Sequence, residues 1–203
     1  DILNSPRRLG STQTKLGDIG YTDVNGDGKI DGEDQVRIGK PTMPHFTYAF
    51  DFSLGYEGFT LSGLLYGTGE RYMTFGNRYQ SGEGKYLYYE NQLNYWRPDN
   101  TGADFPRISI SSGVNGNNNK AGSTFWMRNA SYLRLKDLQL SYDFKYKYLK
   151  RCDWLQTCRV NLSGSNLFTI SGVSKFFDPE TSSTSGDGYP VQRVYSIGVT
   201  IGF

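Results

Sequence analysis

The sequence lacks the features that define several common classes of protein. It has one His, two Cys and three Met among 203 residues, and two cysteines are too few for a disulfide scaffold. The 22 Lys and Arg residues nearly balance the 20 Asp and Glu residues. Because no basic run suits a nucleic-acid groove, we expect no nucleic-acid partner.

Long apolar runs are also missing. No stretch of about 18 apolar residues occurs, so the sequence predicts no transmembrane helix. A membrane is still compatible with this composition, because a transmembrane β-strand needs only about 10 alternating residues. The printed chain begins at Asp1 without a methionine or an apolar leader. That start is typical of a cytosolic protein or of a part taken from a longer protein.

Aromatic residues and glycine, in contrast, are abundant. The chain has 16 Tyr, 12 Phe and 25 Gly, a composition that favours strands and turns. In residues 46–56, FTYAFDFSLGY, apolar side chains occupy every second position and small or polar ones lie between them. This period of two predicts a strand with one apolar face and one polar face.

Four further segments show related alternation, and the fold class that they predict is all-β and antiparallel. The five predicted strands lie at about 46–56, 58–68, 131–144, 157–168 and 192–203. In the third, Leu133 and Leu135 share one parity, whereas Leu138 and Leu140 share the other. One extra residue near Lys136 would reconcile the two parities, which predicts a β-bulge.

Between the second and third strands the alternation stops for about 60 residues, which is rare for a loop in a compact soluble domain. This stretch is rich in Gly, Asn, Ser and aromatic residues. Its segment 115–123, NGNNNKAGS, is predicted to be flexible. A second polar loop at 171–190 precedes the last strand.

The strand lengths suit a lipid bilayer. Strands of this length, tilted by about 45°, cross a hydrocarbon layer about 30 Å thick, and in lipid only a closed barrel pairs every backbone polar group. Five strands cannot close a barrel of useful size, because bacterial single-chain barrels have at least about 8. The sequence therefore predicts a transmembrane β-barrel segment, about five C-terminal strands of a larger barrel, with long extracellular loops.

A soluble β-sandwich or lipocalin-like barrel also has alternating strands and is the alternative. The terminal Phe203 favours the membrane, because a last strand that ends on an aromatic residue resembles the signal read by the outer-membrane assembly machinery. The predicted division is an extracellular loop region at 1–45, then barrel strands and loops at 46–203. The short turn at 55–58 and the connector at 145–156, which is longer than this rule expects, would then face the periplasm.

Six blocks along residues 17–203 carry a family resemblance. They are GDIGYTDVNGDGKIDGEDQVRIGKP (17–41), FTYAFDFSLGYEGFTLSGLLYG (46–67), YWRPDNTGADFPRI (95–108), FWMRNASYLRLKDLQLSYDF (125–144), VNLSGSNLFTI (160–170) and RVYSIGVTIGF (193–203). Together they resemble the C-terminal part of SusC/RagA-type TonB-dependent outer-membrane transporters of Bacteroidetes. The resemblance implies a bacterial outer-membrane barrel of about 22 strands, with a plug domain and a TonB box outside the printed chain.

The same resemblance implies function and partners. Transporters of this family pair with a SusD-like surface lipoprotein and import oligosaccharides or, in some members, peptides, with energy relayed by TonB. The implied surroundings are outer-membrane lipid on one face and substrate on the other. Cys152 and Cys158 depart from the family pattern, and either a disulfide or two free thiols would suit a periplasmic connector.

Residues 23–34, DVNGDGKIDGED, have the spacing of a calcium loop with Gly28 at its sixth position. The predicted Ca²⁺ ligands are Asp23, Asn25, Asp27, the carbonyl of Lys29, Asp31 and Asp34. Crowded carboxylates repel unless a cation neutralises them, so we expect a structural calcium ion that stiffens an outer loop. The alternative is a loop of Asx turns with solvated carboxylates, since an EF-hand usually has flanking helices and Glu at its last position.

Catalytic signatures are absent from the sequence, and we expect no enzyme. His45 has no neighbouring nucleophile, and no GxGxxG, P-loop, HExxH or GxSxG motif occurs. The aromatic residues of 72–96 are expected to pack among loop residues or at a membrane interface, instead of stacking on sugars or contacting the lipoprotein partner. Four charged candidates for a lumen wall are expected to pair with one another: Asp51, Arg134, Asp137 and Asp143.

The combined prediction is a segment of a SusC-like nutrient importer. Two alternatives come from other classes. One is a soluble calcium-binding β-module for adhesion or glycan binding, and the other is a secreted glycan-active enzyme fragment, which is disfavoured because no catalytic pair stands out.

Overall fold

The computed structural model of this chain describes residues 6, 8–10, 14–80, 89–108, 116–181, 184, 188, 189 and 191–203. The chain forms two compact units. Unit 1 comprises Asp1–Lys40, Met73–Arg128 and Lys175–Gly188, and unit 2 comprises Pro41–Tyr72, Asn129–Ser174 and Tyr189–Phe203. This division differs from a linear one at residue 45, because chain segments that are far apart in sequence join the same unit.

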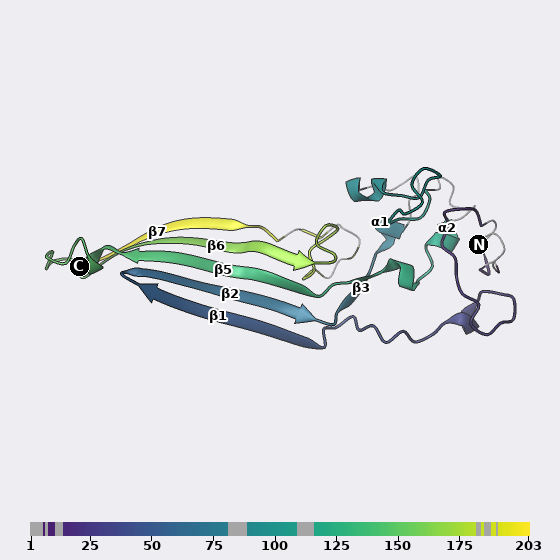
Figure 1. The fold of residues 1–203 in the computed structure, drawn as a ribbon, viewed down its shortest axis with the longest axis horizontal. Helices are drawn as coiled ribbons and strands as arrows, with labels where there is room; N and C mark the ends of the chain where they lie inside the picture. The colour runs from purple at the N-terminus through teal and green to yellow at the C-terminus, as the bar shows by residue number, and fades with distance from the viewer. Residues whose placement is uncertain are drawn as a thin grey trace. The chain divides into compact units, whose positions relative to one another are not determined.

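Unit 2 is built on one five-stranded sheet (Figure 1). Its strands, in spatial order, are β1 (Phe46–Tyr56), β2 (Phe59–Gly69), β5 (Tyr132–Asp143), β6 (Thr157–Ser171) and β7 (Val194–Gly202). Every neighbouring pair is antiparallel. A separate two-stranded sheet pairs β3 (Tyr72–Thr74) with β4 (Met127–Asn129). The predicted all-β, antiparallel fold is confirmed, and each predicted strand occurs within three residues of its expected bounds.

The predicted β-bulge is present in β5. The pairing of β5 with β6 and the pairing of β5 with β2 both shift register between Leu135 and Asp137, so Lys136 has no opposite residue. Because one extra residue moves the following side chains to the other face, the bulge returns the apolar side chains of both halves of the strand to one side.

A two-residue turn reverses the chain between β1 and β2. Glu57 and Gly58 have φ angles of 45° and 86°, and left-handed conformations at both positions match the twist of a tight hairpin. The connection from β5 to β6 begins with the 3-10 turn η4 (Phe144–Tyr146). The backbone N–H of Asp143 donates to the Gly58 carbonyl at 2.9 Å, so the turn and this connector lie at the same end of the sheet.

Unit 1 has short elements around an aromatic core. They are η1 (Gly32–Asp34), α1 (Asn77–Gln80), η2 (Glu90–Leu93), α2 (Gly116–Asn119) and η3 (Thr124–Trp126). The predicted flexible segment at 115–123 is in part wrong: α2 forms there, and Asn118 and Asn119 are 1% and 6% exposed. Their amide groups bond to the backbone and side chains of unit 1, which the composition did not reveal. Among the described residues, no helix is long and apolar enough to cross a membrane.

Candidate functional site

The five-stranded sheet places apolar side chains in continuous rows across neighbouring strands. One such row consists of Leu54, Leu61, Leu140, Leu162 and Ile197, each directly opposite the next. Four of them are exposed, and Ile197 is 77% exposed. Exposed apolar patches of this extent mark an interaction surface in most proteins. We call the face that carries this row the apolar face.

A second row lies on the apolar face beyond the bulge. Phe50 pairs with Leu65, Leu65 with Leu135, and Leu135 with Phe168. Phe50 is 61% exposed. Within β5 the bulge keeps this row on the same face as the first, since without the extra Lys136 the side chains of Leu135 and Leu140 would fall on opposite sides.

Aromatic rings of β1 cover glycines of β2 on the apolar face. The pairs are Phe46 over Gly69, Tyr48 over Gly67 and Phe52 over Gly63. A Cβ at Gly69 would lie 2.1 Å from the Phe46 ring, so the ring occupies the space of a missing side chain. The Tyr48 hydroxyl reaches β5 and donates to the Tyr132 carbonyl at 3.2 Å. The rings therefore lie across the sheet and not away from it.

The opposite face of the same sheet is polar. Next to the leucine row, and one residue along each strand, is the row Ser53, Ser62, Gln139, Ser163 and Ser196. Thus each strand contributes an apolar residue to one side and a polar residue to the other. A sheet with two such unlike faces suits a boundary between two unlike solvents.

The four predicted lumen residues lie on this polar face, and three of them contact neighbours outside the predicted set. Arg134 is buried and its Nε donates to Thr169 Oγ1 at 2.8 Å. Asp137 Oδ1 accepts from Ser165 Oγ at 2.8 Å. The contacts found for these candidates join adjacent strands, because residues on neighbouring strands are closer than residues further along one strand.

Asp143, at the end of β5, follows the same rule. Its Oδ2 lies 3.7 Å from Arg159 Nη2 on β6, and its Oδ1 accepts from the Lys145 backbone N–H at 2.9 Å. The second contact caps the short turn η4.

The predicted calcium loop is a series of Asx turns. Asp23 accepts hydrogen bonds from the backbone N–H groups of Gly26 at 2.6 Å and Gly28 at 2.8 Å. Asn25 accepts from Asp27 at 3.0 Å. These local contacts give the loop its shape, since short polar side chains satisfy backbone donors two to five residues on.

Asp34 closes the loop. Its two oxygens accept from the backbone N–H groups of Val24 and Asp31, each at 2.8 Å. These hydrogen bonds favour the charged form and lower the pKa of the Asp34 carboxyl, with the Asp31 N–H as the larger cause. Asp34 therefore ties the two ends of the predicted ligand set together.

The carboxylate side chains of this loop that the structure describes do not surround a common point. Within the described ranges, no group of three or more His, Cys, Asp or Glu side chains is arranged to hold a metal ion. The backbone carbonyl of Lys29 and the amide of Asn25 would have to complete the set. Calcium binding by residues 23–34 stays a prediction.

The aromatic residues of unit 1 pack against one another. The Phe75 ring, 1% exposed, lies 4.8 Å from the Tyr79 ring and 4.9 Å from the Phe176 ring. Further members of this core are Phe105, Trp126 and Phe177. The expectation that Phe75 and Tyr79 pack among loop residues agrees with these contacts. Tyr86 and Tyr88 of the predicted aromatic segment lie outside the described residues.

A buried polar network, which the sequence did not reveal, adjoins this core. Asp18 Oδ1 lies 2.8 Å from Arg107 Nε and accepts from Asn119 Nδ2 at 3.0 Å. The Trp126 indole N–H donates to the Asn119 carbonyl at 2.7 Å. Burial raises the pKa of Tyr21, whose hydroxyl donates to the Asn118 carbonyl, to about 12. Three of these contacts join residues about 90 to 100 positions apart, and no local pattern signals them.

The remaining single-residue candidates carry no catalytic arrangement. His45 is exposed and its Nδ1 lies 2.5 Å from Glu70 Oε2, in agreement with a surface residue that precedes β1. Cys152 and Cys158 are both free thiols. Neither lies in a group of possible metal ligands among the residues that the structure describes.

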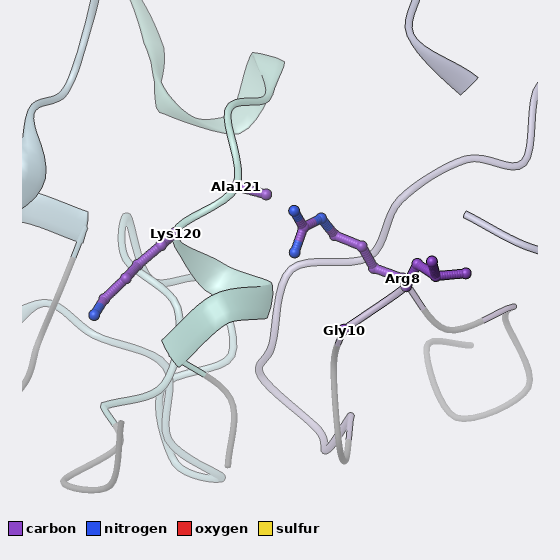
Figure 2. A pocket seen from close by; sticks show the side chains of 5 residues that line it. Arg8, Gly10, Lys120 and Ala121 are labelled. Atoms are coloured by element: carbon purple, nitrogen blue, oxygen red, sulfur yellow. The ribbon is translucent and has the colours of Figure 1, made fainter. Parts of the chain in front are cut away.

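A cavity of about 400 Å³ in unit 1 has a basic lining. Its walls come from Arg8, Leu9, Gly10, Lys120 and Ala121. Figure 2 shows the Arg8 side chain extended toward the 120–121 segment, whereas the Lys120 side chain points away from Arg8. Among the described residues, the lining holds no carboxylate, hydroxyl or thiol side chain, and the Lys120 amine is its one group able to take part in acid–base or nucleophilic chemistry.

Known proteins are similar to this chain in sequence and fold, although no family model matches the chain. It is 27% identical over 202 residues to the TonB-dependent receptor P26 of Formosa agariphila, with 93% of this chain and 20% of the relative covered. It is 26% identical over 196 residues to the TonB-dependent receptor P3 of the same organism, with 90% and 19% covered.

Solved structures agree with these relatives. The RagAB peptide importer in its closed-closed state matches with a TM-score of 0.67 and 27% identity, over 91% of this chain and 20% of that chain. Its open-open state matches with a TM-score of 0.65 and 26% identity, over 90% and 20%. The chain thus spans about one fifth of the length of the proteins that it matches.

The fold and its two faces define a class: the chain is an antiparallel β-sheet segment similar to TonB-dependent receptors. Within that class, its likeness to the RagAB importer confirms the resemblance to SusC/RagA-type transporters. These relatives are named as receptors and as an importer, not as enzymes.

Proposed function

We propose that this chain is part of an outer-membrane TonB-dependent importer. The observation that carries the proposal is the pair of neighbouring rows on opposite faces of one sheet, Leu54 to Ile197 and Ser53 to Ser196. The apolar face would contact lipid, and the polar face would line a water-filled lumen. Such a sheet needs further strands on both edges, because unpaired backbone groups in lipid are costly.

Substrate and partners are part of the proposal. The similar solved structures are those of a peptide importer, which supports a peptide as cargo, and the family resemblance also allows oligosaccharides. A SusD-like lipoprotein would join the complex at the cell surface, and TonB would act through a part of the protein beyond this segment. The long connections that belong to unit 1 would then face outward.

Membrane fractionation of the full native gene product that contains this chain tests the proposal. We expect the protein in the outer-membrane fraction, released only by detergent, with faster gel migration when the sample is left unboiled. A periplasmic or cytosolic protein should be measured in the same fractions as a control. Recovery of the native product as a detergent-free soluble monomer would contradict the proposal and favour a soluble β-module.

A further inference from the structure

One end of the five-stranded sheet carries a cluster of aromatic rings. This turn end comprises Glu57 and Gly58, the connector 144–156 and Phe203. The Phe59 and Tyr142 rings, at the end of the apolar face, are 4.4 Å apart. Tyr142 also contacts Phe144 at 4.9 Å, with the rings at 88°. Aromatic residues that border an apolar belt are typical of the level of lipid headgroups.

The connector joins this cluster at a second point. The Trp154 and Phe203 rings are stacked, 5.8 Å apart with an interplanar angle of 13°. Both are largely exposed, at 67% and 75%. The Gln156 backbone N–H donates to the Gly202 carbonyl at 2.8 Å, so the end of the connector is held against the end of β7. Two large rings are therefore displayed together where the strands end.

The connector is also the most basic segment of a nearly neutral chain. Residues 144–156, FKYKYLKRCDWLQ, hold four basic residues and one acidic residue. Lys145 has a structural role, because its ammonium donates to the carbonyls of Cys152 and Leu155. Lys147, Lys150 and Arg151 are exposed. The opposing charges nearby are those of Asp153 and Glu57, both exposed, and of Asp143, whose carboxylate lies 3.7 Å from Arg159.

The exposed basic groups stand among the aromatic rings. The Lys150 ammonium lies 5.2 Å from the centre of the Tyr146 ring, and Tyr146 and Tyr148 are 49% and 69% exposed. Tyr148 in turn lies 6.2 Å from Phe144. Side chains with an apolar body and a polar tip, next to ammonium and guanidinium groups, match the mixed surface of lipid acyl chains and phosphate groups.

We propose that the turn end of the sheet binds anionic phospholipid headgroups, with Lys147, Lys150 and Arg151 contacting the phosphates. The aromatic rings set the depth of the sheet, and the basic side chains select lipids with net negative charge. This inference rests on the proposed membrane location of the apolar face. Lipid is the expected ligand because the connector directly follows the apolar face, so that the lipid covering this face would end at the level of the connector.

Native mass spectrometry of the full gene product, purified in detergent, tests the proposal. The probe is an equimolar mixture of phosphatidylglycerol and phosphatidylethanolamine with identical acyl chains. We expect wild type to retain phosphatidylglycerol preferentially. In K147Q/K150Q/R151Q this preference should fall by about tenfold or more, since each basic residue near an anionic surface contributes measurably to binding.

Two matched variants distinguish the effect of losing positive charge at the turn end from the effect of damaging the fold. R37Q/K40Q/R193Q removes three exposed basic residues elsewhere and should keep the preference. K147R/K150R/R151K keeps the charges and should also keep it. Heat-modifiable migration of each variant reports folding of the barrel independently of lipid.

Three outcomes would overturn the inference. They are an unchanged preference in K147Q/K150Q/R151Q, an equal loss in R37Q/K40Q/R193Q, and displacement of the lipid by inorganic phosphate, which would indicate a free-anion site. If the native protein is extracted from the outer membrane and yet shows one of these outcomes, only the lipid inference fails. If it is not found in that membrane, the proposed function fails first.

Discussion

The two units use aromatic residues in opposite ways. In unit 1 the rings of Phe75, Phe105 and Trp126 are at most 4% exposed and pack on one another. In unit 2 the rings of Phe50 and Phe46 are 61% and 53% exposed on one side of a sheet. Unit 1 thus follows the arrangement of a protein folded in water, with its apolar groups inside.

Unit 2 follows the reverse arrangement on the apolar face. Its polar row, Ser53 to Ser196, lies on the other side of the same strands, so neither side resembles the interior of a soluble domain. The difference teaches that one composition, rich in Phe and Tyr, can form a buried core in one unit and an exposed apolar face in the other. What decides between them is the period: strict alternation in unit 2, and irregular spacing around short turns in unit 1.

The largest expected effect is in the core of unit 1. Trp126 is 0% exposed and contacts Phe75, Phe105 and Phe125. Trp126→Ala should destabilise unit 1 by about 3–5 kcal/mol, because it removes buried ring contacts and leaves a cavity. Hydrogen exchange of the unit 1 amides in the intact protein measures this loss of stability. Trp154→Ala, which truncates an exposed Trp, is the matched control, and equal losses of protection would contradict the contrast between the units.

The next largest effect is a difference between substitutions on the two faces of the sheet. Leu140→Arg places a charge on the apolar face between the turn end and the middle of the strand, and should destabilise the barrel in lipid by about 2 kcal/mol. Gln139→Arg adds the same charge one residue away on the polar face, and should cost far less. Unfolding of both variants by urea in lipid vesicles gives the comparison. Equal costs at the two positions would mean that the faces are not in different solvents.

A smaller effect concerns the rings that cover glycines. Gly69→Ala forces a Cβ against the Phe46 ring and should cost about 1–3 kcal/mol through overpacking. Phe46→Ala in the same chain should remove most of the added cost, since the three atoms nearest to the added Cβ all belong to that ring. Gly198→Ala, where no atom lies within 4 Å of the added Cβ, is the control. Thermal unfolding in detergent gives the stability of wild type and of each variant. If Gly69→Ala costs as much in a chain that lacks the Phe46 ring, the packing of this ring on Gly69 is refuted.

The smallest expected effect is local to residues 23–34. We predict that calcium binds there with a dissociation constant of about 10⁻⁴–10⁻³ M, as in extracellular modules. Isothermal titration of the native protein should show heat for calcium that Asp27→Ala abolishes. Glu33→Gln, outside the predicted ligand set, should leave the heat unchanged. Absence of heat for wild type, or undiminished heat for Asp27→Ala, would contradict calcium binding at this loop. The loop would then be described by its Asx turns only.

Much of unit 2 could be predicted because alternation is a local signal. Phe46 to Tyr56 shows it without interruption, and the parity change around Lys136 located the bulge. The packing of Phe46 on Gly69 could not be predicted, since it depends on the register between two strands. In unit 1 the contact of Asp18 with Arg107 and Asn119 joins residues about 90 to 100 positions apart. Local composition there suggested flexibility, because a run of asparagines carries no sign of the buried groups that it will meet.

The most direct test of the central claim is the accessibility of probes on neighbouring residues of β5. A spin label at position 140 and one at position 139, in the full protein in lipid, should respond in opposite ways to oxygen and to a water-soluble nickel complex. The account predicts strong relaxation of the label at 140 by oxygen, and of the label at 139 by the nickel complex. Equal access of the nickel complex to both positions would contradict the claim that the apolar face contacts lipid.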